Sequence, residues 1–499
     1  MPAAEQVEVE LKFDVDAGIA APDLRALPGV ISATQPETFA LDATYFDTEG
    51  LDLAGNKITL RRRTGGHDSG WHLKRPTGIP GARRELQVPF DEAPAEAGVP
   101  AALRDPVLVY TRRHELAPVA VISTTRTITT LLGVDEIPLA EFAEDHVTAR
   151  SLLPGGDTQQ WSEWEFELLA GGTPRLLKAA HKQLIAAGGN EPSSSSKLAR
   201  AIGSTPTAHR APELGKRPTA LELVISDLTV QRTALITYDP EVRVDTYDAV
   251  HQMRVATRKF RSILTGFPTV LDSRRTAHIN SELRLLARIL GDARDSEVQL
   301  QMDADLLAGL DPSPALIAAT TGAERAVHSR ALRSAHAAMR SDRYFQLLDE
   351  IDQLLADAPP GPDADLAALT AADRAIAKRR KQIRKAQAHL ATLTEGSEEW
   401  VEQVHDIRKT GKKLRYATEA AAPLNNKQHR RIGAAAKAIQ SALGDWNDTQ
   451  INRARLARLA TAANDLTRSD VFLLGRIDAL QEAAGLRALA AYRRAATEL

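Results

Sequence analysis

The hydrophobic pattern of this sequence changes its period once, close to Thr173. Up to about Leu169, short runs alternate polar and apolar residues, and turn-forming Gly, Pro, Asp and Ser separate the runs. Side chains on a strand alternate between two faces, so this part is predicted to form antiparallel strands. The clearest alternating runs are Val7 to Phe13, Lys57 to Arg63, Trp71 to Lys74, Arg83 to Val88, Ser123 to Leu131 and Trp161 to Leu168.

Beyond Thr173, apolar residues recur at helical spacing. Helices are predicted over Pro174 to Ala187 and Lys197 to Ile202, and a linker rich in Pro and Gly over 206–218. The rest is rich in Ala, Leu and Arg, with one Pro-rich interruption at Ala358 to Asp365. Because 499 residues are too many for one core, we predict a multidomain α+β protein, with its β domain in residues 1–205 and an all-α domain in 219–499.

The helical part contains two copies of one pattern. Val250-His251-Gln252-Met253-Arg254 corresponds to Val404-His405-Asp406-Ile407-Arg408, and Leu290-Gly291-Asp292 corresponds to Leu443-Gly444-Asp445. The copies are about 154 residues apart at the first motif and about 153 at the second. These nearly equal offsets predict two four-helix-like repeats, at about 219–357 and 366–499, on either side of the Pro-rich interruption.

Composition excludes several classes of site. Cysteine is absent, so disulfides, thiolate metal sites and cysteine nucleophiles are excluded. No signal-peptide core and no run of about 18 apolar residues occurs, so we expect a cytoplasmic protein without a membrane partner. The net charge is only -2, so anion binding must depend on local clusters of Lys and Arg. The oligomeric state stays open.

Charged residues share one face of several predicted strands. Glu8, Glu10 and Lys12 alternate with apolar residues and therefore lie on the same face. A surface sheet with one wet face would explain any single strand. If the sheet instead closes with this face inward, the buried charges need partners. Carboxylates suit Mg²⁺ or Mn²⁺, while Arg and Lys suit phosphate oxygens, so a metal-phosphate ligand would satisfy both.

The first part of the chain resembles the CYTH domain (adenylate cyclase, thiamine triphosphatase), a member of the triphosphate tunnel metalloenzymes. Glu8-x-Glu10-x-Lys12 is the signature of that family. The resemblance covers about residues 5–203 and implies an antiparallel β-barrel that forms a triphosphate tunnel. Further segments follow in the family's order: Leu60-Arg61-Arg62-Arg63, Leu73-Lys74-Arg75-Pro76, Arg83-x-Glu85, Arg126, Glu163-x-Glu165-x-Glu167 and Ser196-Lys197-Leu198-Ala199.

The CYTH resemblance also implies roles for individual residues. The implied reaction is metal-dependent hydrolysis of a terminal phosphoanhydride in tripolyphosphate, polyphosphate or a nucleoside triphosphate. Glu8, Glu10 and Lys12 are the expected catalytic residues, and the alternative is a barrel that is inactive or slow. The implied metal ligands for Mg²⁺ or Mn²⁺ are Glu8, Glu10, Glu165 and Glu167. The implied phosphate ligands are Lys12, Arg61, Arg63, Lys74, Arg83, Arg126 and Lys197.

Basic residues form two matching rows in the helical part. Positions i, i+3, i+7 and i+10 of a helix share one face. A solvated basic face would explain one row, but like charges at this spacing repel each other, and the row occurs twice. An anionic polymer along both rows would remove the repulsion. The rows are His251, Arg254, Arg258 and Arg261, flanked by Lys259, and His405, Arg408, Lys412 and Arg415, flanked by Lys413.

The two rows resemble the CHAD domain, a conserved-histidine α-helical domain that binds inorganic polyphosphate. The resemblance covers about residues 219–499 and implies that both histidine helices line one basic groove. Asp295 and Asp448 are expected to cap helices or pair with arginine instead of binding metal. Nucleic acid is a less favoured partner, because aromatic residues make up only 4% of the chain. A polyphosphate-binding protein could also be associated with polyphosphate granules in the cytoplasm.

Overall fold

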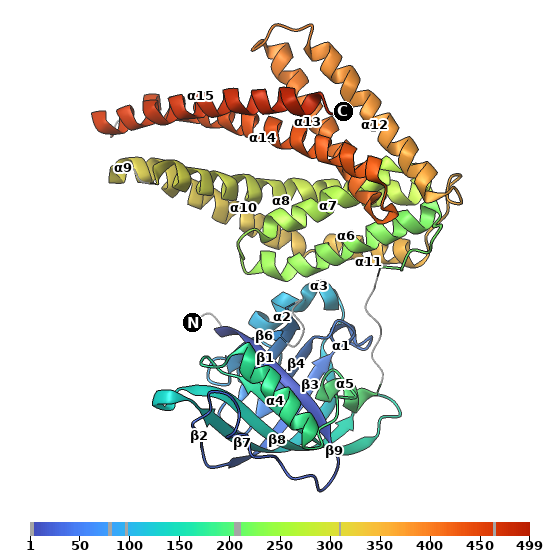
Figure 1. Ribbon diagram of the computed structural model, residues 1–499, viewed down its shortest axis with the longest axis vertical. Coiled ribbons are helices and arrows are strands. Elements are labelled where there is room, and N and C mark those ends of the chain that lie inside the picture. Colours follow the sequence, from blue (N-terminus) through green and yellow to red (C-terminus); the bar gives the residue numbers. More distant parts are fainter. Residues whose placement is uncertain (1–3, 78–81, 95–97, 204–210, 309–310, 463–465) are drawn as a thin grey trace. The chain divides into compact units, whose positions relative to one another are not determined.

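The computed structural model describes residues 4–77, 82–94, 98–203, 211–308, 311–462 and 466–499 (Figure 1). The chain forms two compact units, Met1–Ala208 and His209–Leu499. The division falls inside the predicted linker 206–218, of which residues 206–210 lie outside the described part.

The first unit contains a closed barrel of eight antiparallel strands, as predicted. The strands pair in the order β7-β3-β4-β5-β6-β1-β9-β8, and β8 pairs back to β7. Because the barrel is closed, each of these strands has a hydrogen-bonded neighbour along both of its edges. The strands are β1 (Ala4–Val15), β3 (Glu37–Asp47), β4 (Thr59–Thr64), β5 (Gly70–Pro76), β6 (Ala82–Pro89), β7 (Ala117–Leu132), β8 (Pro138–Ser151) and β9 (Thr158–Leu168), while β2 (Ser32–Ala33) pairs only with β7.

Several strands of the barrel carry apolar side chains outside and charged side chains inside. Phe13 of β1 and Phe166 of β9 are buried on the outer surface against Leu176 and Leu184 of helix α4 (Pro174–Ala186). Elsewhere, three short helices cover the outer faces of β4 and β5. Because the apolar faces of β1, β4, β5 and β9 are covered from outside, the charged faces of these strands point into the barrel. These helices are α1 (Asp52–Gly55), α2 (Ala101–Arg104) and α3 (Leu108–Thr111).

Helix α5 (Lys197–Ile202) packs into the barrel. Ser196 is its N-cap, and the Ser196 hydroxyl accepts a hydrogen bond of 3.1 Å from the amide of Ala199. Leu198 is buried against Ile122 and other apolar residues of the inner face. The cap and this contact fix where the helix begins, so that Lys197, its first residue, points into the charged interior.

The second unit is helical and consists of two four-helix groups, as predicted. The first group contains α6 (Ala220–Arg243), α7 (Ala249–Gly266), α8 (Ser273–Leu307) and α10 (Ala323–Met339). The second contains α12 (Ala368–Leu390), α13 (Glu398–Ala420), α14 (Lys427–Ala462) and α15 (Arg468–Ala496). The helices α9 (Pro314–Ile317) and α11 (Asp342–Ala356) complete the unit. Among the described helices, none combines the length and apolar character needed to cross a membrane.

The two helical groups are joined at several places. Helix α7 lies against α13, so the helices that carry the two basic rows are neighbours. Asp303 of α8 forms a buried ion pair with Arg455 of α14. The Pro-rich interruption lies between α11 and α12, where the amide of Gly361 donates to the carbonyl of Val270 at 2.9 Å. The repeats therefore form one packed unit.

Candidate functional site

The barrel interior contains a cluster of three carboxylates. Asp145 of β8 and Glu163 and Glu165 of β9 each offer one oxygen, and these oxygens lie within 4.8 Å of one another. Cross-strand pairing explains why these carboxylates lie close together, because Asp145 is opposite Glu163 in the β8–β9 register. Three carboxylates at this separation repel unless cations lie between them.

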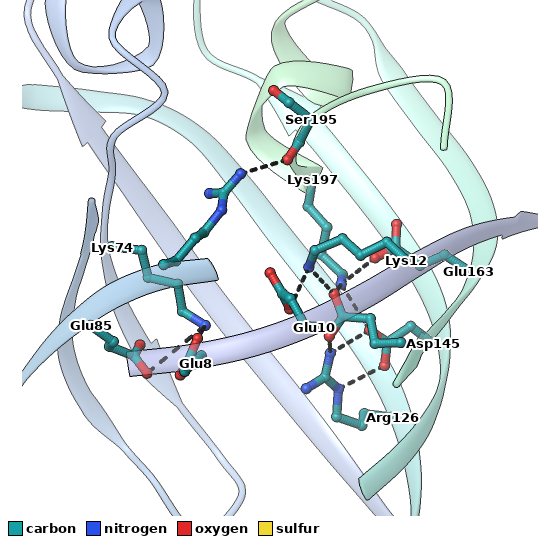
Figure 2. Close-up of polar contacts among 12 residues, drawn as sticks. Glu8, Glu10, Lys12, Lys74, Glu85, Arg126, Asp145, Glu163, Ser195 and Lys197 are labelled. Carbon is teal, nitrogen blue, oxygen red and sulfur yellow. Dashed lines mark hydrogen bonds and ion pairs between the residues drawn. The ribbon is translucent and has the colours of Figure 1, made fainter. Parts of the chain in front are cut away.

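Three cations from different elements neutralise this cluster: Lys12 of β1, Arg126 of β7 and Lys197 of α5 (Figure 2). The ammonium of Lys197 lies 2.8 Å from Asp145 and 2.8 Å from Glu165, and it also contacts Glu163. Burial opposes the charge of Lys197, but the three carboxylates outweigh burial and hold the pKa of Lys197 well above its ordinary value. Arg126 of β7 donates to both oxygens of Asp145, at 2.8 and 2.6 Å.

The carboxylates of β1 have different partners. Lys12 lies 3.1 Å from Glu10 and contacts Glu165. Burial opposes the charge of Glu10, but the charges of Lys12 and Lys74 and the hydrogen bond to Lys12 together lower the pKa of Glu10. Glu8 contacts Lys74 of β5, and burial together with a hydrogen bond to Glu85 raises the pKa of Glu8 to about 8. The pKa values of two neighbouring carboxylates on β1 are therefore shifted in opposite directions.

The two arginines of β4 have fewer carboxylate partners among the described residues than Lys12, Arg126 and Lys197 have. Arg61 donates to the hydroxyl of Tyr45 at 3.3 Å, and Arg63 contacts Asp68 of the following loop. The Nε atoms of both arginines are buried and have no hydrogen-bond partner among the described residues. Burial and the charges of Arg61 and Arg126 lower the pKa of Arg63 to about 9. Buried donors without acceptors indicate a place for an anion.

Most of these groups line one cavity of about 290 Å³ in the barrel; of the three clustered carboxylates, Glu165 lies on its wall, whereas Asp145 and Glu163 do not. Every barrel residue that the sequence singled out for phosphate or metal lies on its wall, including Arg83, which donates to the carbonyl of Ser195 at 2.8 Å. Burial raises the pKa of Glu167, on the same wall, to about 7. The residues brought together are Glu8, Glu10, Lys12, Arg61, Arg63, Lys74, Arg83, Arg126, Glu165, Glu167 and Lys197.

The carboxylate cluster differs from the predicted metal set. Only Glu165 belongs to both sets, because Glu8, Glu10 and Glu167 are not part of the group of three neighbouring carboxylates. Sequence reasoning missed Asp145, because β8 has alanines on both faces and shows no clear alternation. It also left Tyr45 out. Asp145 can be recognised as a site residue only from the strand pairing, which places it opposite Glu163.

The two basic rows meet in the middle of the helical unit. Burial and the charges of Arg254 and Arg408 lower the pKa of Arg258, so the charges of α7 and α13 act on each other. Lys412 is affected in the same way: burial first, then Arg408, Arg258 and Arg254, lower its pKa to about 8. The Nε atoms of Arg258 and Arg408 are buried without a hydrogen-bond partner in the described part of the chain. This cluster of four cations, Arg254, Arg258, Arg408 and Lys412, is called the central cluster below.

The outer members of the rows are more fully paired. Lys259 lies 2.9 Å from Glu419, and Arg415 lies 2.7 Å from the same carboxylate. Arg261 donates to the side chain of Asn280 at 3.2 Å. In the central cluster, by contrast, ion pairs among the described residues are limited to that of Arg254 with Asp295, at 2.8 Å.

The histidines at the start of the rows are His251 and His405, and both are half-buried. Burial and the nearby Arg294 lower the pKa of His251, so this imidazole is neutral at pH 7. Lys413, which flanks the second row, is exposed. Of the two aspartates expected to pair with arginine, Asp295 does so, because it lies 2.8 Å from Arg254. Asp448 is partly buried, and burial raises its pKa.

A closed barrel with a charged interior, followed by a helical unit built from two repeats, defines the class of protein. A CYTH domain matches residues 6–202, and a CHAD domain matches residues 227–457. The chain belongs to the family of proteins in which a CYTH domain is followed by a CHAD domain. This membership associates it with triphosphate and polyphosphate chemistry in general.

Two proteins of Mycobacterium tuberculosis are similar to this chain over nearly their whole length. Uncharacterized protein MT2285 (strain CDC 1551 / Oshkosh) and Uncharacterized protein Rv2226 (strain H37Rv) are each 39% identical over 493 residues, covering 95% of this chain and 92% of theirs. Among solved structures, PptA from Streptomyces chartreusis is 19% identical, covers 56% of this chain and 99% of its own, and has a TM-score of 0.45. The CHAD domain from Ricinus communis is 22% identical, covers 59% and 97%, and has a TM-score of 0.45.

Proposed function

We propose that this protein binds inorganic polyphosphate through its helical unit and hydrolyses the end of a triphosphate or polyphosphate in its barrel. The observation that carries the second part is the pair Arg61 and Arg63, whose buried Nε atoms lack partners among the described residues in a cavity that also holds carboxylates. Phosphate oxygens would accept those hydrogen bonds, and the carboxylates would hold a metal.

The cluster Asp145, Glu163 and Glu165 fits a divalent ion, because it offers only carboxylate oxygens, the donors that Mg²⁺ and Mn²⁺ prefer. Glu10 and Glu167 are paired across β1 and β9 and could add ligands. A bound ion would polarise a phosphoryl oxygen as a Lewis acid. The predicted ligand Glu8 is less suited to this site, because burial and its hydrogen bond to Glu85 raise its pKa to about 8.

The other residues of the cavity bind and orient the phosphate chain. Arg61 and Arg63 would neutralise its oxygens from β4, and Arg126 from β7, which lowers the repulsion that an attacking water meets. The lowered pKa of Glu10 suits it to accept a proton from that water once the site is charged, whereas the raised pKa of Glu8 favours a protonated carboxyl that can donate a hydrogen bond. The two shifts follow from their different lysine and carboxylate neighbours.

Binding of long polyphosphate is supported by the central cluster of the helical unit. Arg258 and Lys412 are partly buried cations whose pKa values are lowered, which means that their charge is destabilised in the free protein. A polyanion would remove this destabilisation and accept from the unpartnered Nε atoms of Arg258 and Arg408. Tethering to the barrel would also raise the local concentration of polyphosphate ends there.

The alternative is a polyphosphate-binding protein whose barrel turns over slowly or not at all. One observation favours it: Lys12, Lys197 and Arg126 already balance the carboxylates where a metal would bind. A metal must then compete with these cations, which would raise the concentration needed for turnover. Turnover measurements distinguish the two functions.

Phosphate release from tripolyphosphate, long-chain polyphosphate and ATP is expected to require Mg²⁺ or Mn²⁺ and to stop with chelator. Asp145→Asn is expected to lower the rate about 100-fold, because it removes one carboxylate of the proposed metal site. The matched control is Glu144→Gln, since the neighbouring residue points to the other face of β8. Unchanged release in Asp145→Asn, or equal losses in both variants, would contradict the metal site. No release in the wild type with any substrate would support the binding-only alternative.

Polyphosphate affinity is expected to fall above pH 8. In the free protein Lys412 loses its proton as the pH rises through its pKa of about 8, and bound phosphate favours the charged form. The loss between about pH 7.5 and 9.5 should therefore approach 10-fold, which corresponds to a shift of roughly one pKa unit on binding. Lys412→Arg keeps its charge over this range and should give a flat profile. Titrations of both proteins check this, and the same decline in both would show that Lys412 is not the group responsible.

A further inference from the structure

A glycine interrupts each of the two longest helices at the same position of the repeated Leu-Gly-Asp motif. Gly291 lies inside α8, a helix of 35 residues, and Gly444 lies inside α14, a helix of 36 residues. Neither has the positive φ that favours glycine. A glycine in a helix interior is unfavourable relative to alanine, so its occurrence at both positions requires another explanation.

The space beside each glycine is filled by an arginine of a basic row. A β-carbon at Gly291 would lie 3.1 Å from Nη2 and 3.4 Å from Cζ of Arg254. A β-carbon at Gly444 would lie 3.7 Å from Nε and 3.8 Å from Nη2 of Arg408. The guanidinium groups of α7 and α13 therefore pass across the bare backbone of the neighbouring long helix. An aspartate one turn further on completes the first contact, since Asp295 lies 2.8 Å from Arg254.

Resting on the proposed polyphosphate binding, we infer that Gly291 and Gly444 are positioning residues for the polyphosphate-binding arginines Arg254 and Arg408. Each glycine leaves room for a guanidinium to lie flat against the helix, which restricts its rotamers before the ligand arrives. An arginine held in this way loses less conformational entropy on binding. We call the contact between each glycine and its arginine a glycine seat. These seats also hold Arg254 and Arg408 in place although Arg258 and Lys412 repel them.

The two seats differ in how closely they fit. The contact of 3.1 Å at Gly291 leaves no room for a methyl group unless Arg254 moves, whereas 3.7 Å at Gly444 is an ordinary van der Waals distance. Alanine at position 291 should therefore displace its arginine, and alanine at 444 should disturb its arginine less. A suitable control is Gly475 inside α15, where an added β-carbon would meet no atom of the described residues within 4 Å.

The experiment is a double-mutant cycle on the full chain. Polyphosphate affinity is measured for the wild type, Gly291→Ala, Arg254→Ala and the double variant, with Gly444→Ala and Gly475→Ala beside them. Gly291→Ala should weaken binding up to about 10-fold, the cost of one newly mobile side chain. The same substitution in Arg254→Ala should change binding less than about 2-fold, because the cycle isolates their coupling. Gly444→Ala should have a smaller effect, and Gly475→Ala none.

Melting of the helical unit, followed by circular dichroism, adds a readout that needs no ligand. Alanine favours helix, so Gly291→Ala should raise the melting temperature by about 2 °C in Arg254→Ala and by less when Arg254 is present. Equal affinity losses with and without Arg254, or no loss in Gly291→Ala, would overturn the seat. If the wild type fails to bind polyphosphate, the proposed binding function is wrong, but the melting test still applies. Equal melting shifts of Gly291→Ala in the wild type and in Arg254→Ala would contradict the contact between Gly291 and Arg254.

Discussion

Replacing Arg61 and Arg63 together with alanine is expected to lower phosphate release by at least about 1,000-fold. A single donor aimed at developing negative charge contributes roughly 100- to 1,000-fold to turnover, and both arginines belong to the barrel cavity. Their buried Nε atoms, unpartnered within the described residues, have no other visible use. Initial rates with tripolyphosphate at saturating Mg²⁺ or Mn²⁺ measure the effect.

The matched control is Arg62→Ala. Arg62 is on the same strand, but it points to the outer face and lies 6.0 Å from the ring of Trp71. Its removal should change the rate less than about 3-fold, within the range of ordinary surface substitutions. Long-chain polyphosphate binding should survive in the Arg61 and Arg63 double variant, because the central cluster is in the other compact unit. Loss of that binding along with turnover would contradict two separate phosphate sites.

Replacing Arg254 and Arg408 together with alanine is expected to weaken polyphosphate binding by about 100-fold. Each removes one charge-assisted contact, worth about 1.5 kcal/mol or more where it is partly buried. The dependence of affinity on salt should also become shallower, by roughly one unit of slope per cation removed, because fewer counter-ions are released. Titrations at several salt concentrations check both expectations.

The control for this variant is the pair Arg340 and Arg343, which lie outside both rows. Arg343 forms an exposed pair with Glu282 at 2.9 Å, so its loss should have little effect on folding. Because the control removes the same formal charge, it separates a general electrostatic effect from a specific groove. Equal losses of affinity in the two double variants would show that α7 and α13 present only a solvated basic surface.

Local geometry made part of the site predictable from the sequence. A strand alternates its side chains, so Glu8, Glu10 and Lys12 had to share a face wherever the strand was placed. A helix repeats every 3.6 residues, so His251 and Arg254 had to share a row. These relations depend on backbone geometry within one element, which is why they hold without knowledge of the fold.

Contacts between elements were beyond such reasoning. Asp145 joins the carboxylate cluster because β8 pairs with β9 in one register, and register depends on long-range packing. The repeated glycines were visible in the sequence, but their use became visible only when Arg254 and Arg408 were found against them.

Tertiary structure also decided whether the charged face of a barrel strand points into the barrel or toward solvent. The alternation of β1 is equally compatible with a charged face in water and a charged face in a tunnel. Helix α4 and the short helices α1 to α3 cover the apolar face from outside, so the charged face can only point inward. The sequence by itself determined which residues share one face of a strand or helix. Only the tertiary structure determined which of these groups meet, because a charge becomes part of a site through neighbours that lie far away in the chain.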